Sequence, residues 1–100
     1  MIQKKFYNEQ QGIISGEIDF VDKSELSFME FIDTGNKKKI KYKYHYMDSN
    51  KNLIFRYDNA MHHPEINTFP HHKHVEDDIE ESTEPEMIDV LSEIQKKLTE

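Results

Sequence analysis

Hydrophobic and polar positions alternate most regularly between Ile40 and Met47. Ile40 and the three tyrosines of this segment fall on one side, while two lysines, His45 and Met47 fall on the other. A strict period of two in β-favouring residues predicts a strand. Because aromatic side chains at this spacing usually pack beneath a covering element, we expect the tyrosines to lie in the core.

Less regular apolar segments predict three further strands. Apolar positions recur within residues 12–21 and 26–32, where Glu30 is an exception on an otherwise apolar face, and a third apolar run spans Leu53–Tyr57. Short polar turns separate these segments, so consecutive strands are expected to pair as neighbours. The pattern therefore predicts a four-stranded antiparallel meander over about residues 11–58.

The remainder of the chain predicts a long loop and a helix. Two prolines and no clear periodicity mark residues 58–82 as a histidine-rich loop. Thr83 and Glu86 have the spacing of a capping box, with Pro85 in the first turn, and predict a helix over 83–98. Its apolar stripe is formed by Met87, Leu91, Ile94 and Leu98 and is widened by Val90 and Ile88. We expect a single α+β domain over 1–100, with this helix packed on one face of the sheet.

Composition narrows the possible locations and chemistries. The 100 residues carry a formal net charge of −7, which is concentrated in the acidic segment 76–100, whereas 1–75 is nearly neutral. With no cysteine, disulfides, thiolate zinc sites and a cysteine nucleophile are excluded. The N-terminus lacks the apolar run of a signal peptide, and no stretch approaches the roughly 20 apolar residues of a membrane span. We therefore expect a cytoplasmic protein without membrane association.

The candidate chemistry lies in the segment Arg56–Val75. Five of the six histidines fall between His62 and His74, and histidine can act as acid, base or ligand near neutral pH. Metal-independent RNA cleavage needs a base, an acid and a cation for the phosphate. The candidate catalytic residues are His62, His63, His71, His72, His74, Arg56 and Asp58. The candidate substrate-binding residues, which would contact phosphates or bases, are Lys41, Lys43, His45, Asn59 and Lys73.

Two other interpretations of the same segment stay open. His71, His72 and His74 with Asp58 could ligate zinc or nickel, although adjacent histidines seldom face one ion and no recognised ligand spacing appears. The site is therefore expected to work without metal or another cofactor. Alternatively, the loop is a non-catalytic surface that binds a protein partner. Exposed strands at the ends of the meander would also allow a homodimer.

Two unusual blocks carry a resemblance to a known family. The blocks D-N-A-x-H-H-P-E at Asp58–Glu65 and F-P-H-H-K-H at Phe69–His74, within residues 40–98, resemble the TumE family of toxins from type II toxin–antitoxin pairs. The resemblance implies a growth-inhibiting protein, suspected to be an RNase, that is neutralised by a helix-turn-helix antitoxin. Met61 departs from the family pattern, which has proline in many members. The family-pattern positions correspond here to Arg56, Asp58, Asn59, His62, His63, His71, His72, Lys73 and His74.

Overall fold

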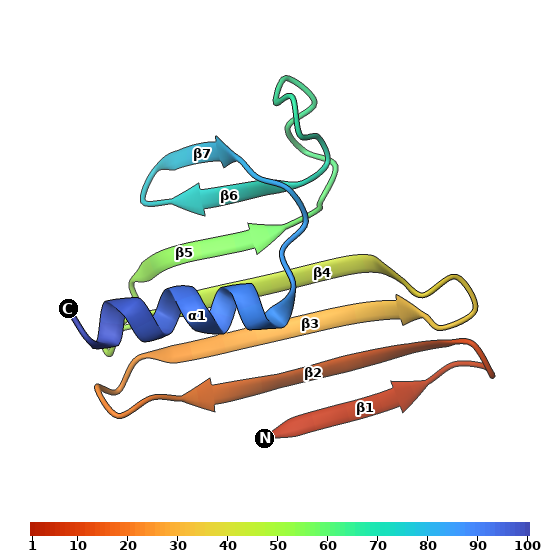
Figure 1. The fold of residues 1–100 in the computed structure, drawn as a ribbon, viewed down its shortest axis with the longest axis horizontal. Coiled ribbons are helices and arrows are strands. Elements are labelled where there is room, and N and C mark those ends of the chain that lie inside the picture. The colour runs from red at the N-terminus through yellow and green to blue at the C-terminus, as the bar shows by residue number, and fades with distance from the viewer.

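Seven antiparallel strands form one sheet in which every strand lies beside its neighbour in the sequence (Figure 1). A computed structural model describes all of residues 1–100. The strands are β1 (Ile2–Phe6), β2 (Gln11–Asp19), β3 (Glu25–Asp33), β4 (Lys38–Met47), β5 (Leu53–Asp58), β6 (His72–Val75) and β7 (Asp78–Glu81). The α+β class and the antiparallel pairing are confirmed, but the expectation of four strands was wrong.

The three additional strands lie at the edges of the sheet. β1 is exposed along its whole length and is held by its ladder with β2, so no apolar face marks it in the sequence. β6 and β7 form a hairpin whose turn contains Glu76 at a φ of 54°. The predicted loop over 58–82 is therefore shorter, since only residues 59–71 connect β5 to β6 without forming a strand.

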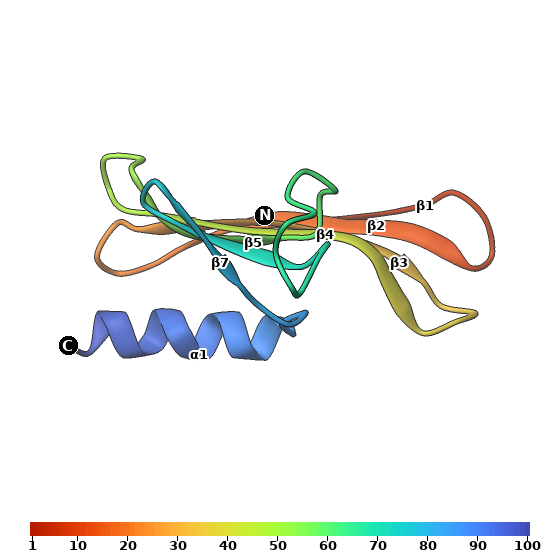
Figure 2. The same ribbon diagram turned by 90° about the horizontal axis from the view of Figure 1, so that it is seen from above.

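The helix α1 (Met87–Leu98) covers one face of the sheet, which we call the helix face (Figure 2). It begins four residues later than predicted, and its capping box pairs Glu86 with Asp89 instead of with Thr83. Pro85 keeps Glu84 out of the helical conformation. Glu86 is extended, with φ −91° and ψ 160°, and is the N-cap, so the helix begins at Met87. No helix in the structure has both the length and the apolar character needed to cross a bilayer.

The core lies between α1 and the central strands. Its buried members come from β3, β4, β5 and α1: Leu26, Phe28, Tyr42, Tyr44, Tyr46, Phe55, Val90 and Ile94. The prediction that the tyrosines of β4 are core residues is confirmed. Ile40 does not join them and is 48 % exposed, because the β3–β4 register shifts beside it so that Lys39, rather than Ile40, pairs with Ile32.

Each buried tyrosine hydroxyl has a polar partner, as buried polar groups require. The Tyr44 hydroxyl bonds to Glu30 and accepts a hydrogen bond from Lys39 Nζ at 2.7 Å. This contact explains the carboxylate that interrupts the apolar face of β3. Tyr46 donates to Ser24 Oγ at 2.7 Å. On β5, Tyr57 donates to Glu93 of α1 at 2.5 Å, which ties the sheet to the helix.

Candidate active site on the open face of the sheet

The sheet face that points away from α1, which we call the open face, carries the charged and imidazole side chains of β4, β5 and β6. Two cross-strand rows run over it. His45 pairs with Arg56, and Arg56 pairs with His74. In the next row, Asp58 lies between Lys43 and His72. Because successive side chains of a strand point to opposite faces, these charged and imidazole groups lie on the face opposite the tyrosine core.

The loop 59–71 brings further histidines to these rows, and a side-chain amide fixes its start. Asn59 Oδ1 accepts a hydrogen bond from the Tyr42 amide at 3.1 Å, and Asn59 Nδ2 donates to the Ile40 carbonyl at 3.1 Å. Asn59 thus replaces a strand partner for β4 where β5 ends. At the other end, Thr68 Oγ1 donates to the His71 carbonyl and accepts from the Ser82 amide.

Loop and strands together enclose a cavity of about 360 Å³, which we call the histidine cavity. It is lined by His45, Leu53, Arg56, Asp58, Ala60, His62, His63, His72 and His74. Lys41 and Lys43 line an adjoining hollow of about 180 Å³, which shares Arg56, Asp58 and Ala60 with the histidine cavity. The two hollows therefore form one continuous basic surface around a single carboxylate.

Asp58 is the centre of the cavity and is almost fully buried. Its Oδ2 atom accepts a hydrogen bond from Arg56 Nε at 2.9 Å, and its Oδ1 atom accepts one from the Ala60 amide at 3.0 Å. His72 Nε2 lies 2.9 Å from Oδ1, and His74 Nε2 lies 3.5 Å from Oδ2. One carboxylate thus orients a guanidinium and two imidazoles, as a buried charge must be paired.

His72 is the most constrained imidazole of the cavity, with a side chain only 3 % exposed. Its Nδ1 atom lies 2.8 Å from the Pro70 carbonyl oxygen. Because that oxygen can only accept, Nδ1 must carry a proton and donate it. The Nε2 atom is then left facing Asp58, and it donates there when the ring is an imidazolium. His72 is therefore held rigidly between two oxygen acceptors.

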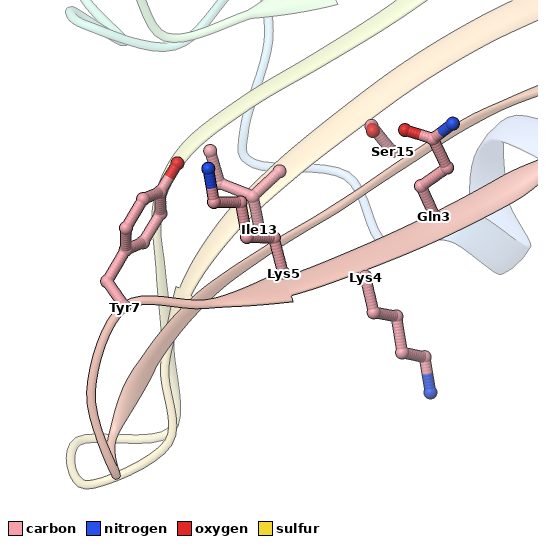
Figure 3. A pocket seen from close by; sticks show the side chains of 6 residues that line it. All are labelled: Gln3, Lys4, Lys5, Tyr7, Ile13 and Ser15. Atoms are coloured by element: carbon pink, nitrogen blue, oxygen red, sulfur yellow. The ribbon is translucent and has the colours of Figure 1, made fainter.

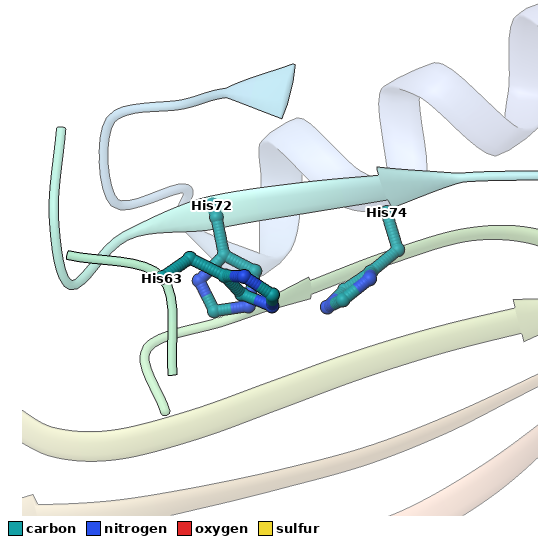
Figure 4. Close-up of side chains that lie close together, drawn as sticks. All are labelled: His63, His72 and His74. Carbon is teal, nitrogen blue, oxygen red and sulfur yellow. The ribbon is translucent and has the colours of Figure 1, made fainter. Parts of the chain in front are cut away.

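His63 and His74 are more accessible and face the same space. Their side chains are 25 % and 27 % exposed, and their ring centroids lie 5.8 Å apart. His72 lies close to both, with centroid distances of 5.1 Å to His63 and 4.8 Å to His74. Figure 4 shows the three rings converging, two from β6 and one from the loop. His63 Nδ1 also lies 3.4 Å from Glu65 Oε1.

Burial and neighbouring cations act on two of the imidazoles. Burial lowers the pKa of His45, and the positive charges of Arg56 and Lys43 add to this effect. The His45 Nδ1 atom is buried and has no hydrogen-bond partner. Burial also lowers the pKa of His74, although the Asp58 carboxylate acts in the opposite direction. Both rings consequently favour the neutral form, which has a free lone pair.

Two of the candidate residues lie on the helix face, away from the cavity. The His71 ring stacks on Tyr42, and its Nδ1 atom lies 2.9 Å from the Tyr42 hydroxyl. Lys73 pairs with Glu93 of α1 at 2.9 Å. Alternation in β6 explains the second case, because Lys73 points opposite to His72 and His74. Asn59 is not part of the cavity lining, and its amide is engaged by the backbone of β4.

Two groups of the site were not among the sequence candidates. Glu65 approaches His63, and the Pro70 carbonyl fixes His72. The signal for Glu65 was present in the His-His-Pro-Glu block, because a carboxylate two residues from a histidine can orient its ring. The role of Pro70 has no sequence signal, since any residue supplies a carbonyl.

A third and larger hollow, of about 490 Å³, lies between β1 and β2, far from the histidines (Figure 3). Its lining is formed by Gln3, Lys4, Lys5, Tyr7, Ile13 and Ser15. It contains amines and hydroxyls but no carboxylate or imidazole. Figure 3 also shows Lys4 pointing away from the other side chains. The histidine cavity, which combines acid, base and cation, is therefore the better candidate for chemistry.

Fold and cavity together define a small α+β protein whose candidate site is built from three strands and one loop, with histidines around a buried aspartate. The chain belongs to the TumE family, since the family model described as "Toxin TumE" matches residues 1–100. No curated protein and no solved structure matches the chain. Membership places the chain in a family of toxins, and a toxin family implies an antitoxin as partner.

Proposed function

We propose that the protein is the toxin of a type II toxin–antitoxin pair and acts as a metal-independent endoribonuclease in the cytoplasm. Its partner would be a helix-turn-helix antitoxin. The observation that carries the proposal is the meeting of two accessible imidazoles, His63 and His74, beside Arg56 in one cavity. A base, an acid and a cation within one hollow are the groups that cleavage of RNA by its own 2′-hydroxyl requires.

His63 and His74 are the proton-transfer pair in this scheme. One imidazole takes the proton of the 2′-hydroxyl while O2′ bonds to phosphorus. The bond from phosphorus to O5′ then breaks, and the other imidazole donates its proton to O5′. The products are a 2′,3′-cyclic phosphate and a 5′-hydroxyl. His72 is nearly inaccessible and bonded through both ring nitrogens, so it serves as a positioning residue together with Asp58.

Arg56 would stabilise the charge that develops on the phosphate. Its Nε–H group is engaged by Asp58, which leaves the terminal N–H groups of a side chain that is 37 % exposed. Lys41 and Lys43, in the adjoining hollow, would hold the phosphates that flank the cleaved bond. His45 and His62 complete the lining of the cavity but are not assigned a proton-transfer role.

The test is cleavage of total cellular RNA by the purified protein in the presence of a chelator. We expect discrete fragments that end in 2′,3′-cyclic phosphate, and a 10²- to 10⁴-fold (order of magnitude) lower rate for His63→Ala or His74→Ala. His71→Ala is the matched control, because it removes an imidazole from the opposite face and should cleave like the wild type. Intact RNA from a correctly folded protein that still arrests growth would refute the proposal.

A further inference from the structure

The three imidazoles that converge in the histidine cavity have a second property besides acid–base chemistry. The ligand nitrogens of His63, His72 and His74 all lie within 4.8 Å of one another. Around a tetrahedral Zn²⁺ with bonds of about 2.1 Å, ligand nitrogens lie roughly 3.4 Å apart. Modest rotation of the two partly exposed rings would close the difference (Figure 4). The cluster is therefore close to the geometry of a three-histidine metal site.

The outer contacts of these rings also match those of metal ligands. A histidine that binds a metal usually donates its other ring N–H group to a carbonyl or carboxylate, which fixes the tautomer. His72 Nδ1 bonds to the Pro70 carbonyl at 2.8 Å, and His63 Nδ1 lies 3.4 Å from Glu65. These contacts would leave Nε2 as the ligand atom in both rings.

We propose that His63, His72 and His74 bind one divalent transition-metal ion per chain. Asp58 lies against two of these rings and is the candidate fourth ligand. Imidazole ligands favour zinc, cobalt, nickel or copper over magnesium and calcium, which prefer oxygen. Arg56 competes for the same carboxylate at 2.9 Å, so binding requires that Asp58 be shared with or released from Arg56.

The position of His71 makes this ligand set different from the one that the sequence suggested. That set combined His71 with His72, His74 and Asp58. His71 instead lies against Tyr42 on the helix face, and His63 of the loop takes its place. A ligand set that joins two separated segments has no recognisable spacing, because the fold and not the local sequence brings the ligands together.

The consequence for function rests on the proposed ribonuclease activity. An ion at this site would occupy the lone pairs of His63 and His74, the two rings that must accept and donate protons. The bound ion would therefore inhibit RNA cleavage, so the same cavity would be active when free of metal and inactive when loaded. Metal binding itself does not depend on the activity.

The experiment is titration of the full chain, purified without a histidine tag, with Co²⁺ and Zn²⁺. We expect one ion per chain by calorimetry and visible absorption of tetrahedral Co²⁺ that Zn²⁺ abolishes, with no response to Mg²⁺. His63→Ala/His74→Ala should lose both signals, whereas His71→Ala should keep them. Absence of a stoichiometric ion, or equal binding by the double variant, would overturn the inference.

Parallel RNA digests separate this inference from the proposed function. One outcome would support both the metal site and the ribonuclease: RNA is cleaved in chelator, cleavage stops when Zn²⁺ is added in excess, and it resumes when chelator removes the Zn²⁺. Stoichiometric Co²⁺ binding by a protein that never cleaves RNA would support the metal site and refute the ribonuclease. Cleavage that appears only with added ion would also support the site, and it would refute both metal independence and inhibition. Cleavage that saturating Zn²⁺ leaves unchanged would refute inhibition.

Discussion

The two faces of the same three strands satisfy their polar groups in opposite ways. On the helix face each tyrosine hydroxyl has its own partner, and lysine ammonium groups are matched by nearby glutamates. On the open face, several donors converge on the single carboxylate of Asp58, and His45 Nδ1 has no partner at all. The helix face thus pairs its polar groups one by one, whereas the open face gathers them around one carboxylate in a cavity.

Alternation along a strand can therefore assign one residue to the core and the next residue to the candidate site. Tyr57 and Arg56 are adjacent in β5, yet one anchors the helix and the other lines the cavity. Substitutions on the two faces should therefore have distinguishable effects on stability and activity.

The largest effect is expected from Asp58→Ala. The change leaves the buried His72 without its acceptor and also removes the acceptor of the partly exposed Arg56. The free energy of unfolding should therefore fall by about 3–5 kcal/mol, and RNA cleavage should be lost. Urea denaturation and the RNA digest measure the two effects. Asp58→Asn is the matched control and should lose less stability, because its amide oxygen can still accept from the Ala60 amide in place of Oδ1. It cannot replace Oδ2 as the acceptor for Arg56, since the other amide atom is a donor. Equal losses for both variants would contradict this account.

A stability effect without a chemical effect is expected from Ile94→Ala on the helix face. Ile94 is fully buried against the sheet, and its truncation should lower the free energy of unfolding by roughly 2–5 kcal/mol. The cleavage rate of the folded fraction should stay at the wild-type value. Comparison with Ile88→Ala, at an exposed position on the same helix, controls for changes in helix propensity. A parallel loss of rate in Ile94→Ala would show that the faces are coupled.

Alkaline pH should weaken the helix face selectively. Burial raises the pKa of Tyr42, Tyr44 and Tyr57 above the ordinary value of 10.0. Burial opposes a rise for Lys73, but its bonds to Glu93 and Tyr57 prevail and raise its pKa. All four groups hold protons more tightly when folded, so their stabilisation is complete below about pH 10 and declines as pH rises further. Urea denaturation midpoints between about pH 8 and pH 11 measure this decline. In Tyr57→Phe the midpoint should change less steeply with pH.

The smallest effect is expected at His45. Its buried Nδ1 lacks a partner, and replacement of an unsatisfied polar group by an apolar one is close to neutral or stabilising. His45→Leu should therefore change the free energy of unfolding by no more than about 1 kcal/mol, in either direction. A loss well above this value in thermal or urea denaturation would indicate that Nδ1 has a partner, such as a bound water.

The sequence predicted the helix face better than the open face. The tyrosine alternation of β4 and the stripe of α1 determine which residues are buried, because apolar periodicity reports directly on burial. The prediction that Ile40 shares the buried face of the tyrosines was wrong, because a change of register removes it from that face. Periodicity carries no information about bulges. The strand β7 was missed for a different reason. Its four residues are exposed and mostly acidic, so they form no apolar face that a sequence pattern could reveal.

The candidate site was predicted in composition but not in geometry. The segment Arg56–Val75 does supply most of the cavity, whereas the grouping of His71 with His72 was wrong. Adjacent residues of a strand point apart, and β6 begins at His72, so the partner of His72 had to come from elsewhere. His63 reaches His72 because the loop 59–71 is held by the hydrogen bonds of Asn59 and Thr68. No local sequence pattern reveals these bonds.

The bond between Asn59 and β4 makes a single amide a reporter of loop motion. The Tyr42 amide is a strand N–H group whose acceptor is a side chain of the loop instead of a neighbouring strand. Its hydrogen can exchange with solvent deuterium only when Asn59 releases it, and that release frees the start of the loop that carries His62 and His63. The exchange rate at this one position therefore measures how often the start of the loop that lines the histidine cavity detaches from β4.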